Sequence, residues 1–326
     1  MMSNLKITQA DANMAAAPQQ SKAEELQWYS PELPYFRLAG FAFGGSENGY
    51  CRFPTSAAAA MQPANPALAM LASNTAGGQL YFCTDSSVLQ IKVTLRDTAV
   101  LCHMTATGQC GFDCYSMDEQ GKYQFVNAVK YDQNVTEYTF EFLSGYETKF
   151  RNFLLHFPLY CGVKQLQIGL RKDAKLALPK SFKQDGRVVV YGTSITQGAC
   201  ASRPGMAYTN LLSRQLGIEW INFGFSGNGN GETAVIQLAA SIPNVRLFVV
   251  DYEANAGLNG VLEKTFDGVI DGFRAVHPHT PILVLSLIKV ASLMHSASQQ
   301  ADLLRRRIFM QKNIANRVQN GDENLC

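Results

Sequence analysis

A single serine stands in a turn directly after a run of β-branched residues. Residues 188–191 read VVVY, are continuously apolar and show no helical period, which predicts a buried parallel strand. A serine just past the carboxyl end of such a strand lies where open α/β sheets place their ligand sites. Ser194 is therefore a candidate nucleophile, although a serine in such a turn also commonly caps the next helix.

Two later turns carry groups that could assist a nucleophilic serine. Gly227 follows a predicted strand at residues 218–225, and Asn255 follows another at residues 247–251. Neighbouring strand ends in one sheet lie about 5 Å apart, so these turns can converge on Ser194. The Ser194 and Gly227 amides and the Asn255 carboxamide would then supply three donors to an oxyanion. Each could also be an ordinary loop residue, but three in this order favour a site.

These turns belong to a strand–helix alternation that fills the second half of the chain. A fourth strand is predicted at residues 282–287, and helical periods cover residues 208–216, 233–240, 262–273 and 304–318. Alternation of this kind predicts a doubly wound parallel sheet with helices on both faces.

The first half of the chain alternates with period two instead. Apolar and polar residues take turns over residues 89–95, 137–142 and 165–170, with short turn signals between such stretches. This pattern predicts an antiparallel β-sandwich. We expect four regions: a mobile tail at 1–30, a β-sandwich at 31–172, a linker at 173–186 and an α/β domain at 187–326.

Composition excludes several classes of partner. The formal net charge is +2 and no basic cluster stands out, so we expect no nucleic-acid partner. No apolar run reaches about eighteen residues and the start lacks the apolar centre of a signal peptide, so we expect a cytoplasmic protein without a membrane partner. The eight cysteines have no zinc-type spacing, and free thiols are favoured over a metal site that includes Cys102, His103, Cys110 and Cys114.

The three turns resemble the sequence blocks of the SGNH (GDSL-like) hydrolase superfamily. Residues 191–198, YGTSITQG, look like the first block, which carries the nucleophilic serine. Residues 222–227, NFGFSG, are similar to the second block, whose glycine amide lines the oxyanion hole. Residues 251–255, DYEAN, resemble the third block, although the usual Gly-x-Asn-Asp wording is absent. The resemblance implies a three-layer, flavodoxin-like domain, with Ser194 as nucleophile and Gly227 and Asn255 as the oxyanion hole.

The first half resembles the sandwich domain that precedes the hydrolase domain in one subgroup of this family. That subgroup is named for a Gly-x-Asp-Leu-Tyr motif, and residues 111–115 read GFDCY, with cysteine in place of leucine. Such a sandwich could bind sugar or form a wall of the neighbouring active site.

The family also has an Asp-x-x-His block near its carboxyl end, which supplies the general base and the carboxylate that orients it. None of the five histidines has an aspartate three residues earlier: His103, His156, His277, His279 and His295. His103 and His156 stand in strand-like stretches, so we expect both to be packed side chains and not catalysts. We therefore expect residues 1–326 to lack the domain's last strand and helix, and to be nearly inactive, because a neutral serine is a poor nucleophile. His295 is a less favoured substitute base.

The function that this resemblance implies is hydrolysis of a small acyl ester, such as an acetylated carbohydrate, through an acyl-enzyme on Ser194 and without metal or organic cofactor. Transfer of the acyl group to an alcohol would use the same site. A non-catalytic carbohydrate-binding relative is the first alternative. The second is a dinucleotide-binding domain, because Gly229, Gly231 and Ala234 fit G-x-G-x-x-A, with Asp251 about twenty residues later.

Overall fold

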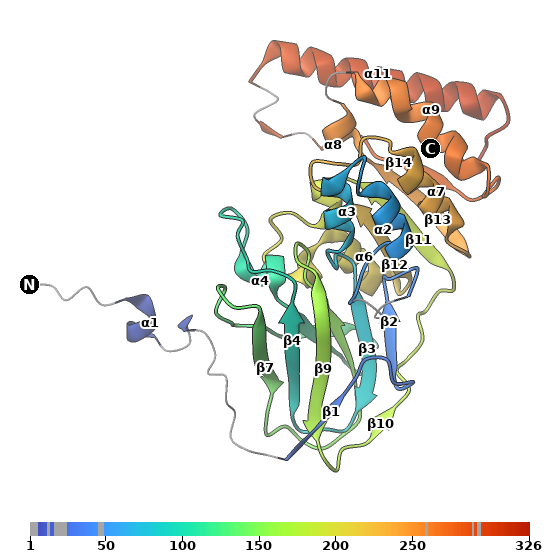
Figure 1. The fold of residues 1–326 in the computed structure, drawn as a ribbon. Helices are drawn as coiled ribbons and strands as arrows, with labels where there is room; N and C mark the ends of the chain where they lie inside the picture. The colour runs from blue at the N-terminus through green and yellow to red at the C-terminus, as the bar shows by residue number, and fades with distance from the viewer. Residues whose placement is uncertain are drawn as a thin grey trace, which may run out of the picture.

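The computed structural model describes residues 6–11, 14–15, 25–44, 49–257, 260–288, 290–291 and 295–326. An antiparallel sandwich forms one end of the molecule and a helix-covered parallel sheet forms the other (Figure 1). Both predicted architectures are confirmed. In the described ranges, no helix is both long and apolar enough to span a membrane.

The sandwich consists of two sheets in which every strand pair is antiparallel. The first sheet has the order β1 (Leu26–Tyr29), β9 (Val163–Arg171), β4 (Leu89–Leu95) and β7 (Glu137–Leu143). The second has the order β10 (Leu176–Ala177), β3 (Gln79–Thr84), β8 (Arg151–His156), β5 (Asp113–Met117) and β6 (Tyr123–Ala128), and β2 (Phe36–Ala39) also pairs with β3. Along β4, Ile91 and Val93 are buried whereas Lys92 is exposed, as the period-two pattern predicts.

Two strands lie outside the range expected for the sandwich. β1 falls within the expected tail at 1–30, but its residues pair with the end of β9, and a short helix, α1 (Ile7–Ala10), precedes it. Residues 1–5, 12–13 and 16–24 of the expected tail lie outside the described residues. β10 falls within the expected linker at 173–186, and it extends the second sheet by pairing with β3. Backbone pairing therefore orders both segments, although neither has a strong apolar pattern.

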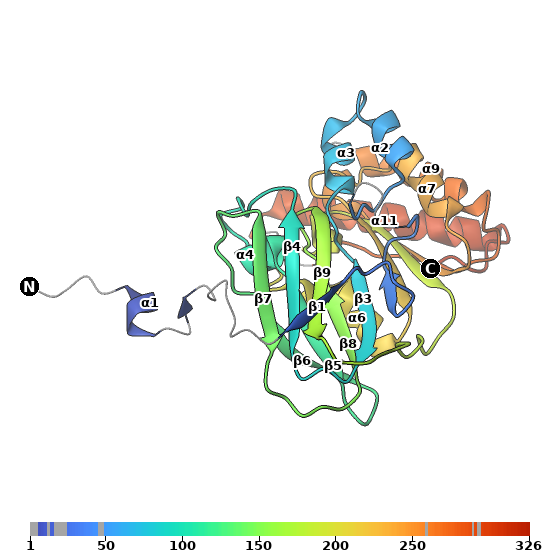
Figure 2. The ribbon, with the colours of Figure 1, turned by 60° about the horizontal axis from the view of Figure 1, so that its bottom comes forward.

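Three helices interrupt the sandwich strands: α2 (Thr55–Met61), α3 (Pro66–Ala72) and α4 (Ala106–Cys110). Figures 1 and 2 show α2 and α3 beside the parallel sheet. Leu68 and Leu71 of α3 are buried in one cluster with Phe223 of that sheet, and Phe53 packs edge-on against Phe223. A helical insertion in the first half of the sequence therefore completes the core of the second domain.

The parallel sheet has the order β12 (Glu219–Gly224), β11 (Arg187–Gly192), β13 (Val245–Asp251) and β14 (Ile282–Val284). In chain order this is 2-1-3-4, the flavodoxin-like arrangement, whose switch point lies between the first and third strands. The helices after the strands are α5 (Ser194–Gln197), α6 (Tyr208–Leu216), α7 (Thr233–Ser241), α8 (Glu253–Ala256), α9 (Val261–Arg274) and α11 (Ala297–Gln319).

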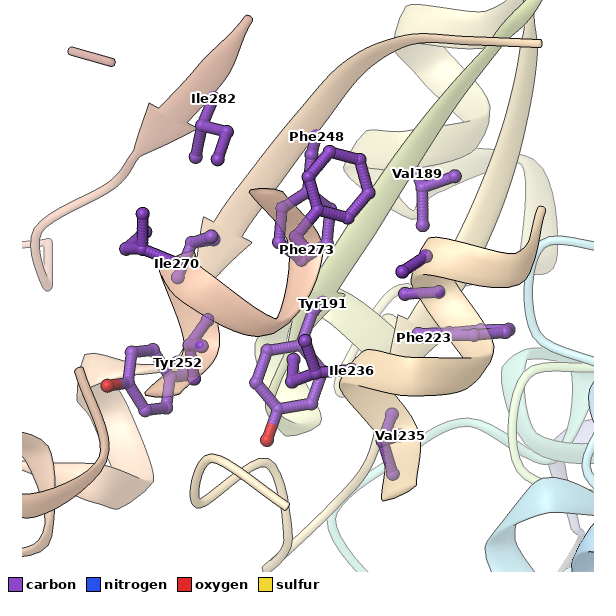
Figure 3. Packing of buried hydrophobic residues seen from close by; sticks show 14 of the residues in the cluster. Val189, Tyr191, Phe223, Val235, Ile236, Phe248, Tyr252, Ile270, Phe273 and Ile282 are labelled. Atoms are coloured by element: carbon purple, nitrogen blue, oxygen red, sulfur yellow. The ribbon is translucent and has the colours of Figure 1, made fainter. Parts of the chain in front are cut away.

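Helices cover both faces of this sheet. On one face Val188 and Val190 pack with Leu212 of α6. On the other face α7 and α9 cover Tyr191 and Phe248, and the ring of Phe273 stacks on that of Phe248 (Figure 3). The alternation of adjacent β11 residues between two covered faces explains why the whole strand is apolar.

The fourth strand is shorter than predicted. β14 ends at Val284, not at residue 287, and residues 324–326 run beside it through bonds from Ile282 N to Asn324 O (2.8 Å) and from Val284 N to Cys326 O (2.7 Å). The contact between Ile282 and Leu325 is a parallel bridge, so these last residues extend the order of the sheet beyond β14.

Candidate active site

The serine turn is held by the residue before the serine. Thr193 is the N-cap of α5: its hydroxyl accepts from Ile195 N (3.3 Å), and its own N–H donates to the Thr196 hydroxyl (3.3 Å). Ser194 is thus the first helical residue, and it is partly exposed. Capping, the alternative role considered for Ser194, is performed by Thr193, which leaves the Ser194 hydroxyl available for chemistry.

The loop after β12 folds over the end of β11. Phe225 N donates to Gly192 O (3.1 Å), and Ser226 N donates to the Gln197 side chain (2.9 Å). Gly229 has φ +76°, and a Cβ added there would lie only 2.3 Å from Gly192 O. Glycine is required at this approach, which brings the loop that carries Gly227 onto the serine turn.

The turn after β13 is tied to the same loop. Asn255, in α8, donates a side-chain N–H to the backbone oxygen of Asn228. The Asn228 side chain in turn accepts from Asn65 Nδ2 (2.8 Å), which caps α3. The ends of β11, β12 and β13 are also in register, since Gly192 pairs with both Gly224 and Asp251. The structure therefore brings together the three turns that the sequence singled out.

Two backbone donors at this edge have no partner among the residues that the structure describes. In the described part of the chain, neither the Ser194 N–H nor the Gly227 N–H makes a hydrogen bond. Gly227 is exposed, has φ +66° and has nothing within 4 Å of an added Cβ. Asn255 keeps a second side-chain N–H besides the one given to Asn228. The edge thus offers the kind of preformed donors that stabilise an oxyanion.

Asp251 has a role that the sequence did not reveal. Its carboxylate accepts from the Thr196 hydroxyl (2.8 Å) and from the Tyr208 hydroxyl (2.8 Å). Burial raises the pKa of Asp251. The two hydrogen bonds oppose this effect but are weaker, so the pKa stays above its ordinary value. Asp251 therefore holds α5 and α6 on β13, beneath the serine turn. The only sequence signal was an acidic residue at a strand end.

An aspartate–histidine pair exists, but it lies between the domains. Asp113, in the GFDCY motif, bonds His156 Nδ1 (2.9 Å), and Arg214 Nη1 lies 3.0 Å from His156 Nε2. Arginine only donates, so Nε2 must accept, and Nδ1 carries the proton given to Asp113. Burial lowers the pKa of His156, consistent with this neutral form. His156 is thus a packed histidine, as expected, and its ring nitrogens are engaged away from Ser194.

The other histidines lie elsewhere. His277 Nε2 bonds Ala240 O (2.8 Å), and its ring stacks on Phe273. The prediction that His103 is packed in a strand is wrong, because His103 lies exposed in a turn. His279 and His295 are also exposed. Across the described ranges, no histidine is hydrogen-bonded to Ser194.

The glycine-rich turn that suggested a dinucleotide site is filled by the chain itself. The Glu232 carboxylate accepts from Gly229 N (3.1 Å) and Asn230 N (3.0 Å), and Gly231 N donates to the Tyr191 hydroxyl (2.7 Å). In a dinucleotide fold such amides face the pyrophosphate. Here a carboxylate occupies that position and would repel a phosphate group, which argues against the dinucleotide alternative.

Comparison with protein families identifies both halves of the chain. Residues 26–176 match the GxDLY family, described as the N-terminus of SGNH hydrolase-type esterases. Residues 185–326 match the GDSL-like lipase/acylhydrolase family. The chain belongs to the SGNH (GDSL-like) hydrolases. It carries the N-terminal GxDLY domain of one subgroup, and its second domain is that of an ester-hydrolase family.

Solved structures resemble this chain over most of its length. A protein described as a GDSL-like lipase from Bacteroides ovatus is 28% identical, with a TM-score of 0.82 over 92% of this chain and 86% of that one. The salicylyl-acyltransferase SsfX3 from a tetracycline biosynthetic pathway is 18% identical, with a TM-score of 0.73 over 93% and 85%. A family two carbohydrate esterase from Clostridium thermocellum, solved with cellohexaose, is 14% identical, with a TM-score of 0.53 over 77% and 81%. The last two likenesses show the fold. No curated protein matches the sequence.

Proposed function

We propose that this SGNH protein is a serine ester hydrolase that removes a small acyl group from a carbohydrate ester through Ser194. The observation that carries the proposal is the pair of amides, those of Ser194 and Gly227, that have no partner among the described residues, on two turns joined by the bonds Phe225 N–Gly192 O and Ser226 N–Gln197 Oε1. Donors already fixed in place cost no reorganisation during the reaction, which is the main requirement for stabilising a tetrahedral intermediate.

The proposed reaction has two acyl-transfer steps. The Ser194 oxygen attacks the ester carbonyl, a base takes the hydroxyl proton, and the carbonyl oxygen becomes an oxyanion held by Ser194 N–H, Gly227 N–H and Asn255 Nδ2. The intermediate collapses, the bond to the alcohol oxygen breaks, and the alcohol leaves with a proton. Water then attacks the acyl-enzyme in the same donor set and releases the carboxylic acid and free Ser194.

The carbohydrate part of the proposal draws support from fold likeness. A family two carbohydrate esterase resembles this chain in fold, with a TM-score of 0.53 over 77% of the chain at 14% identity. We therefore propose an acetylated sugar as the substrate class, with acetylated xylo-oligosaccharides as the first compounds to test.

The proposed base is not among the described contacts of Ser194. Without a base the serine hydroxyl stays protonated and attacks slowly. We therefore expect the polypeptide of residues 1–326 to accelerate ester hydrolysis only by about 10³–10⁴-fold over water. In the serine-protease template, this is the rate acceleration that binding and an oxyanion hole still supply when the triad is incomplete.

A base supplied from solution tests this proposal. Imidazole has the size and pKa of a histidine side chain, and it can reach a partly exposed serine. Release of nitrophenolate from 4-nitrophenyl acetate is measured against imidazole concentration for the wild type and for Ser194→Ala, which reports the background reaction of imidazole. Intact mass spectrometry after a short reaction detects the acetyl group on the protein.

The proposal predicts a wild-type rate that rises with imidazole above the Ser194→Ala background, together with an acetyl group that the variant does not acquire. Equal rates in both proteins at every imidazole concentration would refute a nucleophilic Ser194. A high wild-type rate that imidazole does not change would show instead that a base acts within residues 1–326. Added methanol separates the two fates of the acyl group, since hydrolysis yields acetate and transfer yields methyl acetate.

A further inference from the structure

A loop of the sandwich domain reaches the serine turn. The segment between β8 and β9 contains Leu159 and Tyr160. Tyr160 Oη donates to the backbone oxygen of Ser194 (3.3 Å), and Gln197 Nε2 donates to Leu159 O (3.0 Å). Both ends of α5 are therefore fixed by sandwich residues that lie 34 and 38 positions away in the sequence.

The Tyr160 phenol also meets the loop that carries Gly227. The Ser226 side chain is near enough to the Tyr160 phenol to lower its pKa, and since the phenol gives its one proton to Ser194 O, it can interact with Ser226 only as an acceptor. Gln197, which donates to Leu159 O, also accepts from Ser226 N (2.9 Å), so a second connection joins the sandwich loop to this residue. Tyr160 thus bridges the serine turn and the residue directly before Gly227, and no such role could be assigned from its place in the sequence.

A buried arginine of the same domain holds the strand that leads into this loop. Arg52 is 1% exposed, and its guanidinium donates only to backbone oxygens, with distances of 3.1 Å to Asn222 O and 2.6 Å to Gly224 O. Two further bonds reach Asn74 O (3.0 Å) and Leu71 O (2.7 Å). Burial lowers the pKa of Arg52 to about 9, so the side chain is still charged at neutral pH.

The arginine and the tyrosine act on each other electrostatically. Burial raises the pKa of Tyr160. The neighbouring Ser226 side chain and the charge of Arg52 oppose this effect but are weaker, so the pKa stays above its ordinary value. The phenol is therefore neutral at working pH and keeps the proton that it donates to Ser194 O. Arg52 also anchors the end of β12, the strand that leads into the loop of Ser226 and Gly227.

We propose that Tyr160, supplied by the sandwich domain, is a positioning residue that holds the Ser194 amide and the Gly227 amide at the separation that an oxyanion requires. This inference rests on the proposed function and extends it, because it makes the sandwich part of the active site. Oxyanion donors act at about 2.7–3.1 Å, so a small relative displacement of the two turns weakens both.

The test compares two tyrosines of the same domain. Tyr160→Phe removes the hydroxyl and keeps the ring. Tyr131→Phe is the matched control, since Tyr131 is also partly buried and donates to a backbone oxygen, that of Ala106 (3.1 Å), which is not part of the serine turn. Both variants are assayed with 4-nitrophenyl acetate and imidazole, and melting temperatures are recorded. We expect Tyr160→Phe to lower kcat roughly three- to tenfold, the range of one net hydrogen bond, with KM unchanged and Tyr131→Phe without effect on kcat.

A double-mutant cycle distinguishes a positioning role of Tyr160 from a general loss of stability in the variant. If Tyr160 acts through Ser226, the kcat effects of Tyr160→Phe and Ser226→Ala are less than additive. An unchanged kcat in Tyr160→Phe, a change confined to KM, or full additivity overturns the positioning role while wild-type reaction at Ser194 keeps the proposed function intact. A wild type that never exceeds the Ser194→Ala background overturns both.

Discussion

Replacing Asp113 by alanine should destabilise the protein by removing the centre of the interface between its domains. Asp113 is completely buried and accepts from His156 Nδ1 (2.9 Å) and from Gly205 N (2.8 Å). Arg203 Nε lies 3.5 Å from the same carboxylate. These partners come from β8 and from the segment before α6, so one carboxylate joins the sandwich to the hydrolase domain.

The magnitude follows from the groups that Asp113→Ala leaves behind. Two buried donors, His156 Nδ1–H and Gly205 N–H, lose their acceptor, at about 1–3 kcal/mol each. Moving the proton of His156 to Nε2 gives no relief, because that nitrogen would then face the donor Arg214. The expected loss in the free energy of unfolding is therefore about 2–6 kcal/mol.

Guanidinium chloride unfolding at pH 7, followed by circular dichroism, measures this loss. Glu119→Gln is the matched control, because Glu119 is exposed in the turn after β5 and should change stability by less than about 0.5 kcal/mol. A loss below about 1 kcal/mol in Asp113→Ala, or a loss equal to that of the control, would refute the assignment of the motif to the interface.

Two further substitutions test the support of the site. Gly229→Ala should displace the loop after β12, because the new Cβ would lie 2.3 Å from Gly192 O. We expect the rate of Ser194 acetylation to fall at least tenfold. Gly121→Ala is the control: Gly121 has a similar φ of +75° but open space around an added Cβ, so this variant should keep the wild-type rate. Asp251 has a folded pKa raised above its ordinary 3.8, so its contribution to stability is present below that value and is lost as pH rises through the folded pKa. Between pH 4 and pH 7, the free energy of unfolding of Asp251→Asn should therefore fall less than that of the wild type. Denaturant unfolding at the two pH values measures both falls. An equal or larger fall in the variant would contradict the buried setting of this carboxylate.

The order of the parallel sheet explains why much of the site could be read from the sequence. Parallel strands end at one edge, so a serine, a glycine and an asparagine that each follow a predicted strand must lie near one another. Period-two alternation likewise predicted the sandwich. Both signals are local, since neighbouring residues in the chain carry the whole pattern.

The contributions of the first half to the site had no such signal. Arg52 meets Gly224 across 172 positions, and Tyr160 meets Ser194 across 34. Each is a single residue in a turn or loop, and nothing in the adjacent sequence distinguishes it from an ordinary surface arginine or tyrosine. The α2–α3 insertion is similar, because its apolar residues could equally have packed on the sandwich. Only tertiary packing decides these contacts.

The most direct test of the account is where a fluorophosphonate probe reacts. The probe forms a covalent bond with an activated serine oxygen, and peptide mass spectrometry of the protein treated in the presence of imidazole locates it. The account predicts labelling at Ser194 in the wild type and no label in Ser194→Ala. Labelling of another residue in preference to Ser194, or a wild type that remains unlabelled under these conditions, would contradict it.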